Sequence, residues 1–291
     1  MNTNKHKKRT LLITGAGGFV GSHLIKAACE AGWETAGFWH SAEPPSINGC
    51  TSLSVEITDE YAVASAIDDI MPSVVIHCAA VAGIGKCADN KEKADAVNIE
   101  GTRNIVQSAT RTGAYLIFVS TDLVFDGFRG YYEECDSPAP ACYYGTTKYS
   151  GELITVSSGC RSSIARLATI YGHGSSNFLD KLLGQLQRGE TTSLFNDEYR
   201  SFVFIDDVCA KLLKLAENKT EGIFHIAGPE RLSAYDFGLK VAECYGFDKT
   251  LIHPVSSYKE KRPKDCSLKN DKTVIELREF YSVETALLKG S

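Results

Sequence analysis

This 291-residue chain lacks a long hydrophobic stretch, a C-x-x-C pair and any internal repeat. Its apolar runs break at glycines within a few residues, as in TLLITGAGGFVG, so we predict neither a membrane span nor a secretion signal. The ten cysteines are irregularly spaced, which favours reduced, mostly buried thiols in a cytoplasmic protein and argues against a metal site.

Strong positive charge is also missing. The net charge is −5, and the one basic cluster lies in the tail MNTNKHKKR, which we expect to be solvated. A nucleic-acid surface needs clustered Lys and Arg, so this class of partner is not expected.

What the chain does contain is a regular alternation of short apolar runs with segments of helical period. The runs TLLIT, TAGF, SVVIHCAA, YLIFVS and SSIARLATIYG are predicted strands. This alternation predicts an α/β fold, a Rossmann-type doubly wound parallel sheet. We expect residues 1–170 to form this cofactor-binding domain.

The pattern becomes less regular after residue 170. SFVFIDDVCAKLLKLAEN suggests a strand followed by a helix that starts at Asp206 or Asp207, and LSAYDFGLKVAECYG suggests a second helix. Residues 171–291 are therefore predicted to form a smaller, mixed α/β substrate-binding region, partly interleaved with the first. It would cover the carboxyl ends of the strands, where open α/β sheets bind ligands.

The first predicted strand runs into a glycine turn, TGAGGFVGSHL. Gly15, Gly18 and Gly21 follow the spacing G-x-x-G-x-x-G; they permit the tight turn, the approach of a pyrophosphate and close helix packing. A nicotinamide dinucleotide is the cofactor that this turn predicts, with Phe19 and Val20 also in contact with it.

The end of the second strand, GFWHS, carries no acid. An acid there would bind the ribose 2′-hydroxyl and repel a 2′-phosphate, so its absence favours NADP(H), with His40 nearby, although NAD(H) stays possible. In SVEITDEY, Glu56 and Ile57 are expected near the adenine; the alternative is a surface acid after a strand.

Two neighbouring tyrosines precede Lys148 in CYYGTTKYSGE. Tyr144 and Lys148 are four residues apart, about 40° around a helix, whereas Tyr143 is five residues away, about 140°. Helix geometry therefore selects Tyr144 as a proton donor, and we expect an adjacent Lys148 ammonium to lower the pKa of its phenol. Tyr143 is expected to be a packing or pocket residue.

Reduction of a carbonyl needs a second hydrogen-bond donor, because the oxygen gains charge. The strand YLIFVSTDLVFDG ends with two hydroxyls, those of Ser120 and Thr121, and either can serve by this argument.

Taken together, the motifs resemble those of the extended short-chain dehydrogenases, and among them the dTDP-4-dehydrorhamnose reductase family. The resemblance covers nearly the whole chain, through TGAGGFVGSHL, HCAAVAG, NIEGTRNI, STDLVFDG, EECDSPAPACYYGTTKYSGE, RLATIYG, FHIAGPERLS and RPKDCSLKNDK. It implies that Thr121, Tyr144 and Lys148 are the catalytic residues. It further implies that the nicotinamide lies beside Ala79, Ala80, Val81 and Val119.

The reaction that we predict is NAD(P)H-dependent reduction of the 4-keto group of a nucleotide-linked deoxysugar. Dehydratases of this type carry Asp-Glu after the threonine, but here Thr121 is followed by Asp122 and Leu123. A nucleotide-sugar epimerase and a non-catalytic NADP-binding regulatory subunit remain as alternatives. Related reductases also carry an Asp and a Glu where this chain has Gly85 and Ala88, so the identity of the sugar stays open.

The nucleotide-sugar pocket should draw on the second region and on the end of the fifth strand. An arginine fork suits a diphosphate, although a lone arginine often forms only an ion pair. The residues expected to bind substrate are Thr121, Asp122, Asn177, Phe178, Arg200 and Arg262. A homodimer is possible, but no apolar patch in the sequence decides it.

Overall fold

The computed structural model describes residues 9–174, 177–258, 262–270 and 279–290. Among them, seven strands form one parallel sheet in the order β11-β6-β5-β4-β1-β2-β3. These are β1 (Thr10–Thr14), β2 (Glu34–Trp39), β3 (Cys50–Ser54), β4 (Val74–His77), β5 (Tyr115–Thr121), β6 (Ser162–Leu167) and β11 (Gly222–Ile226). The Rossmann-type prediction is confirmed.

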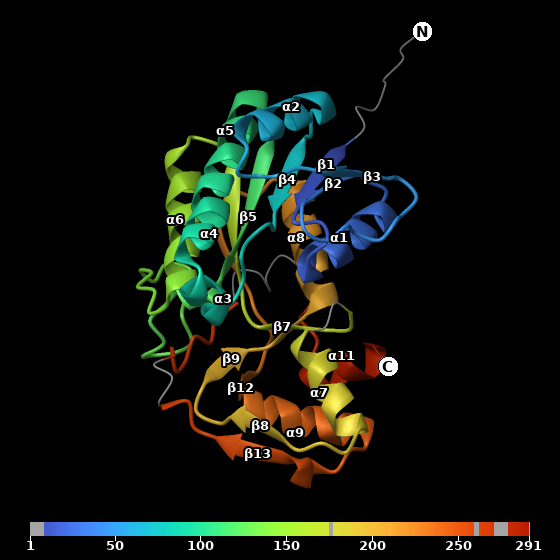
Figure 1. Cartoon of the computed structure of the whole chain (residues 1–291), viewed down its shortest axis with the longest axis vertical. Helices are drawn as coiled ribbons and strands as arrows, with labels where there is room; N and C mark the ends of the chain where they lie inside the picture. The colour runs from blue at the N-terminus through green and yellow to red at the C-terminus, as the bar shows by residue number, and fades with distance from the viewer. Residues whose placement is uncertain (1–8, 175–176, 259–261, 271–278, 291) are drawn as a thin grey trace.

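Helices cover both faces of the sheet (Figure 1). One face carries α1 (Phe19–Glu30) packed against α8 (Ile205–Asn218), and the other carries α2 (Glu60–Ile70), α5 (Thr102–Thr112) and α6 (Tyr143–Ser157). Because both faces are covered, β4 and β5 are buried along their whole length, as expected for central parallel strands. The short α3 (Ile84–Asp89), α4 (Lys91–Asp95) and a π-helical turn (Ala96–Gly101) connect β4 to α5.

The chain order reverses between β1 and β4. Strands β2 and β3 lie on one side of β1, and β4 and β5 on the other. Such a switch point opens a crevice at the carboxyl ends of the strands. The glycine turn after β1 and the loop after β4 meet there, which positions the candidate site.

A smaller region lies below the sheet in Figure 1. It contains α7 (Phe178–Gln187), β8 (Thr192–Phe195), β9 (Tyr199–Ser201), β12 (Arg231–Ser233), α9 (Ala234–Tyr245), β13 (Ile252–Val255) and α11 (Val283–Gly290). Strand β8 pairs with β13, and β9 pairs with β12. Helix α9 begins with a capping box of Ser233 and Asp236.

Residues after 170 also build the main sheet, since β11 pairs with β6 and α8 packs on α1. Helix α8 begins at Ile205, just before the two acids expected to start it. The short strands β7 (Ile170–Tyr171) and β10 (Val203–Phe204) pair with each other between the two parts. The proposed division at residue 170 stays a prediction.

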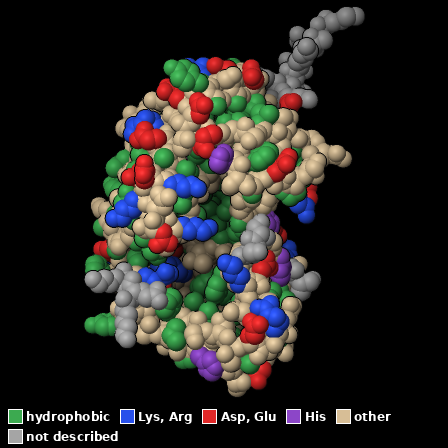
Figure 2. Space-filling view, in the orientation of Figure 1, with side chains coloured by type: hydrophobic (Ala, Val, Ile, Leu, Met, Phe, Trp, Pro, Cys, Tyr) green, Lys and Arg blue, Asp and Glu red, His purple; other side chains and the backbone are tan. Residues whose placement is uncertain are grey.

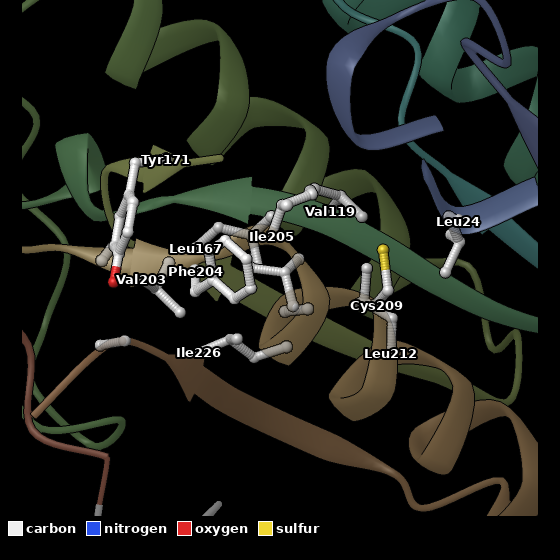
Figure 3. Packing of buried hydrophobic residues seen from close by; sticks show 14 of the residues in the cluster. Leu24, Val119, Leu167, Tyr171, Val203, Phe204, Ile205, Cys209, Leu212 and Ile226 are labelled. Atoms are coloured by element: carbon white, nitrogen blue, oxygen red, sulfur yellow. The ribbon is translucent and has the colours of Figure 1, made fainter. Parts of the chain in front are cut away.

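A continuous apolar core connects sheet and helices. Figure 3 shows Val119 and Leu167 of the sheet beside Phe204, Ile205 and Cys209 at the start of α8. All five residues are buried and belong to one cluster that extends into the smaller region. The two parts therefore share packing, which holds the ends of β5 and β9 in fixed relation.

All ten cysteines lie among the described residues and none forms a disulfide. The expectation that most of the thiols are buried is wrong: Cys87, Cys209 and Cys266 are buried, whereas the other seven are partly or fully exposed near the ends of helices and strands and in loops. Within the same residues, no helix combines the length and hydrophobicity needed to cross a membrane.

Candidate active site

The turn between β1 and α1 is closely packed. Gly15 has φ +69°, and a Cβ there would lie 2.7 Å from the Ala79 nitrogen; a Cβ at Gly21 would lie 2.2 Å from the Gly15 oxygen. Both glycines are therefore required by the protein itself. Gly17, which is not part of the G-x-x-G-x-x-G spacing, is required as well, because a Cβ there would lie 1.7 Å from the Ala42 oxygen.

Gly18 differs from these glycines. Only the Gly15 oxygen, at 3.2 Å, lies close to the position of a Cβ, so packing alone does not demand glycine. Gly18 caps α1 without a side-chain hydrogen bond, and Phe19 begins the helix with its ring against His23. The amide groups at this helix end suit an anion such as a pyrophosphate.

The predicted adenine-side residues have different roles in the fold. Glu56 Oε2 lies 3.1 Å from His40 Nε2. Although β2 itself ends without an acid, a carboxylate that follows β3 therefore reaches the end of β2. Ile57 is 6% exposed and packs against Gly101. A Cβ added to Gly101 would lie 2.7 Å from the Ile57 Cδ1 atom. Ile57 is thus a core residue as well as a candidate for adenine contact.

The loop after β4 is held by buried polar side chains. The amide of Ala79 donates to the Thr14 hydroxyl (3.2 Å), and Val81 exchanges two backbone hydrogen bonds with the side chain of Asn98. Asn98 also donates to Thr147 of α6 (2.9 Å), which ties this loop to the catalytic helix. Ala80 lies between these two anchored residues, so the predicted nicotinamide side has a rigid wall.

Tyr143 and Tyr144 begin α6 and point to different places. The Tyr143 hydroxyl donates to both carboxylate oxygens of Asp95 at 2.8 Å, and Lys91 lies over its ring. The Tyr144 phenol lies near Thr121 at the end of β5, close enough for the Thr121 hydroxyl to influence the phenol's pKa. The helix geometry that separates the two tyrosines is therefore seen directly.

The electrostatic prediction for Tyr144 is wrong for the protein alone. Burial raises the pKa of its phenol well above the usual value, and the Asp122 carboxylate acts in the same direction. The Thr121 hydroxyl opposes this effect without cancelling it. Tyr144 is consequently neutral at pH 7 and carries the proton that an acid must donate.

Lys148 is buried and has no hydrogen-bond partner among the residues that the structure describes. Its side chain is 1% exposed, and Nζ lies 4.1 Å from the centre of the Phe118 ring. Burial lowers the pKa of this amine to about 8, although Cys78 and Glu152 favour the charged form. An unsatisfied buried ammonium is costly, so its presence indicates that a hydrogen-bonding ligand belongs here.

The two hydroxyls at the end of β5 are distinguished by their partners. Ser120 donates to Glu152 (2.6 Å), which forms a two-point ion pair with Arg166, and both charged side chains are 2–3% exposed. Thr121 instead hydrogen-bonds Asp122 (3.0 Å) and lies beside Tyr144. Of these two hydroxyls, Thr121 is the one that influences the phenol.

Two of the predicted substrate residues lie next to this group. Asp122 is 4% exposed; burial raises its pKa, which Arg200 opposes. The Arg200 Nε lies 3.6 Å from Asp122 Oδ2, and its other nitrogens donate to the carbonyls of Tyr199 and Pro263. Arg200 thus connects β9 to the end of β5.

Arg262 is brought to the same place by Glu198. The Arg262 Nε donates to Glu198 Oε1 (2.7 Å), and Arg200 lies 3.9 Å from the other oxygen of this carboxylate. Glu198 is 6% exposed, and sequence reasoning missed it because an acid beside an arginine in EYRS has no distinctive spacing.

Asn177 and Phe178 have structural roles at the start of α7. Asn177 accepts from the amides of Leu179 and Asp180 and donates to two glycine carbonyls, so both ends of its side-chain amide are engaged. The Phe178 ring lies 5.8 Å from that of Phe237.

The surface is hollowed between the two parts of the molecule, with Lys and Arg side chains at the edges of the hollow (Figure 2). The sheet's switch point faces this side, and β9 approaches it from below in Figure 1. A phosphorylated small molecule fits such a setting by charge.

Comparison with known proteins accords with this geometry. A family model described as RmlD substrate binding domain matches residues 9–285. The chain belongs to this family, that of the dTDP-4-dehydrorhamnose reductases. The resemblance stated from the motifs is thereby confirmed.

Two relatives of this chain carry different names. The probable low-salt glycan biosynthesis reductase Agl14 of Haloferax volcanii is 34% identical over 246 residues, 82% of this chain and 81% of the relative. Methionine adenosyltransferase 2 subunit beta of Xenopus laevis is 30% identical over 257 residues, 85% and 75% of the two chains.

The solved dTDP-4-dehydrorhamnose reductase of Bacillus anthracis, in complex with NADP, has a TM-score of 0.87 and 24% identity, covering 97% of this chain and 98% of that one. At this identity the likeness concerns the fold.

Buried residues that support the site also escaped sequence reasoning. His77 is fully buried between Thr14 (2.6 Å) and Thr102 (3.0 Å), and burial lowers its pKa to about 3, so the ring is neutral. Asn98 lies in NIEGTRNI, where its position gave no signal of its bonds to Val81.

Proposed function

We propose that the chain is an NAD(P)H-dependent reductase of the 4-keto group of a nucleotide-linked deoxysugar. The observation that carries this proposal is that Tyr144, at the start of α6, lies beside Thr121 at the end of β5, while Lys148, one turn further along α6, is buried over Phe118 of the same strand. Membership of the dTDP-4-dehydrorhamnose reductase family and the relative named a glycan biosynthesis reductase support it.

The residues present fit a nicotinamide dinucleotide. Gly18 leaves the amide end of α1 accessible to a pyrophosphate, and the partnerless Lys148 ammonium suits the hydroxyls of a ribose. When bound, the reduced nicotinamide would supply the hydride.

The protein's own part in the reaction is proton donation and charge stabilisation. Tyr144, held neutral by burial, donates its proton to the keto oxygen as that oxygen gains charge. Thr121 adds a hydrogen bond to the same oxygen, and the positive charge of Lys148 stabilises the phenolate that remains.

We further propose NADP(H) as the preferred cofactor, because β2 itself ends without an acid. The Glu56–His40 pair makes this testable: a free carboxylate would favour NAD(H), whereas a carboxylate occupied by His40 is a weaker barrier to a 2′-phosphate. Fluorescence titration with NADPH and NADH should give the lower Kd for NADPH. Glu56→Gln should widen the difference.

For the substrate we propose that Arg200, Arg262 and Asp122 border the nucleotide-sugar pocket. The two guanidinium groups gathered by Glu198 suit a diphosphate, and Asp122 adjoins the triad. Asn177 and Phe178 stay as proposed substrate residues at the start of α7.

Turnover tests this assignment. The protein is incubated with NADPH or NADH and a panel of dTDP-, UDP- and GDP-linked 4-keto-6-deoxysugars, and loss of reduced nicotinamide is followed by absorbance. Stoichiometric oxidation with one sugar supports the reductase. Isomerised sugar without net oxidation would instead identify an epimerase.

A second function, a regulatory subunit that binds NADP, is favoured by one observation: the relative at 30% identity is named as subunit beta of methionine adenosyltransferase 2. Tight cofactor binding without turnover of any sugar in the panel would support this role. The complete Thr121, Tyr144 and Lys148 set favours the reductase.

A further inference from the structure

The Thr121 hydroxyl has a single proton, and it would face two acceptors once a substrate is bound: the Asp122 carboxyl and the keto oxygen. It donates to Asp122 Oδ1 at 3.0 Å, accepts from the Leu123 amide at 3.3 Å and lies near the Tyr144 phenol. A hydroxyl offers one proton and two lone pairs. Where its single proton points therefore depends on what Asp122 does.

An ionised Asp122 can only accept. The Thr121 proton is then directed to Oδ1 in a charge-assisted hydrogen bond, and none remains for a substrate oxygen. A neutral Asp122 can donate instead. Thr121 then accepts from Asp122 and from the Leu123 amide, which fills both lone pairs and leaves its proton free to bind the keto oxygen.

We propose that Asp122 is a positioning residue that, in its neutral form, donates to Thr121 and so directs the Thr121 proton toward the substrate oxygen. This inference rests on the proposed reductase function. It assigns to Asp122 a role that requires no contact with the sugar.

The surroundings of Asp122 suit a carboxyl that changes its protonation state. Its side chain is 5% exposed, and Oδ2 has no hydrogen-bond partner in the described part of the chain. Arg200 of β9 approaches this oxygen only to 3.6 Å, which is an ion-pair distance without a hydrogen bond.

Several groups face this carboxyl from different elements. Arg200 favours the carboxylate, whereas burial favours the neutral acid and raises the pKa of Asp122 above the ordinary value. Three further groups lie within electrostatic range of the Asp122 carboxyl. They are Tyr144 and Cys142, at the start of α6, and Cys266. All three are uncharged at neutral pH, because burial raises the pKa of each.

The first test is the pH dependence of kcat with a sugar that the enzyme reduces. Wild-type kcat should fall at least tenfold as Asp122 ionises, since loss of one oxyanion donor costs about 10²–10³-fold. In Asp122→Asn the amide donates permanently, so this decline should vanish. Asp126→Asn, a matched change in the same STDLVFDG segment, should retain it. Persistence of the decline in Asp122→Asn would overturn the proposal.

The second test needs no turnover. Infrared difference spectra are recorded during a pH titration, and the carboxyl band absent from Asp122→Asn but present in Asp126→Asn is assigned to Asp122. Its midpoint should lie clearly above about 4, the usual aspartate value, and in an active enzyme should coincide with the decline in kcat. A midpoint in the ordinary range would overturn the inference.

The two hypotheses fail in distinguishable ways. Absence of turnover with every sugar would remove the reductase assignment, while the infrared midpoint would still decide whether Asp122 is a donor. Turnover with an ordinary midpoint, or with a decline unchanged by Asp122→Asn, would leave the reductase intact and reject the role of Asp122.

Discussion

Ser120 and Thr121 are neighbours on β5, yet the polar clusters around them are built differently. Ser120 is paired across the sheet with Arg166, and both meet Glu152 of α6 in a buried group with bonds of 2.6–3.0 Å. Thr121 meets Asp122 and Arg200, where the ion-pair distance is 3.6 Å and one carboxylate oxygen has no partner among the described residues.

The difference separates a structural cluster from a functional one. In the first cluster Glu152 uses both oxygens, so it holds α6 firmly against the sheet. In the second, one oxygen of the Asp122 carboxyl is without a hydrogen-bond partner among the described residues, and Lys148 Nζ nearby on α6 is too, so both have capacity for a ligand.

The largest expected effect is on proton donation. Tyr144→Phe should keep cofactor binding and lower kcat by about 10²–10⁴-fold, because the phenolic proton is removed. Steady-state kinetics and NADPH titration measure the two quantities. Tyr143→Phe, which loses only its bonds to Asp95, serves as the matched control and should be mild. Equal losses in the two variants would refute the assignment of Tyr144.

Breaking the Ser120 cluster should affect folding. Glu152→Ala leaves the Arg166 guanidinium buried without its carboxylate, which should lower the free energy of unfolding by about 3–5 kcal/mol in denaturant titrations. Glu221→Ala breaks the exposed pair with Arg161 and should cost less than about 1 kcal/mol. Similar costs for the two variants would contradict the contrast between buried and exposed pairs.

Thr121→Val and Ser120→Ala test the two hydroxyls directly. Thr121→Val should reduce kcat by about 10²–10³-fold, with little change in unfolding free energy, because it removes an oxyanion donor. Ser120→Ala should show the opposite pattern, a loss of about 1 kcal/mol in stability with kcat nearly retained. A large fall in kcat for Ser120→Ala would show that the clusters are not separable in this way.

The smallest effect concerns Lys148. Its pKa is lowered to about 8, so the ammonium is present below this pH and lost above it. Turnover should decline about threefold between roughly pH 7.5 and roughly pH 8.5, following the charged fraction. Lys148→Arg keeps its charge and should abolish this dependence, which a kcat profile of both proteins would reveal. A profile unchanged by the substitution would exclude Lys148 as its source.

The parts of the site that sequence predicts are those with local geometry. The glycine turn follows from Gly15 and Gly21, which have no room for a Cβ, and the choice of Tyr144 follows from helical spacing. Prediction failed where distant segments meet. Glu56 reaches the end of β2 from another strand, and Glu198 gathers arginines 62 positions apart, Arg200 and Arg262.

Sequence alone determined the alternation of strands and helices, the phosphate-binding turn and which tyrosine lies near Lys148, because each depends on periodicity over a few residues. The tertiary structure decided which hydroxyl adjoins Tyr144, which carboxylates are paired, and that burial raises the phenol's pKa. These properties depend on desolvation and on the charges that packing brings together, neither of which is encoded in local spacing.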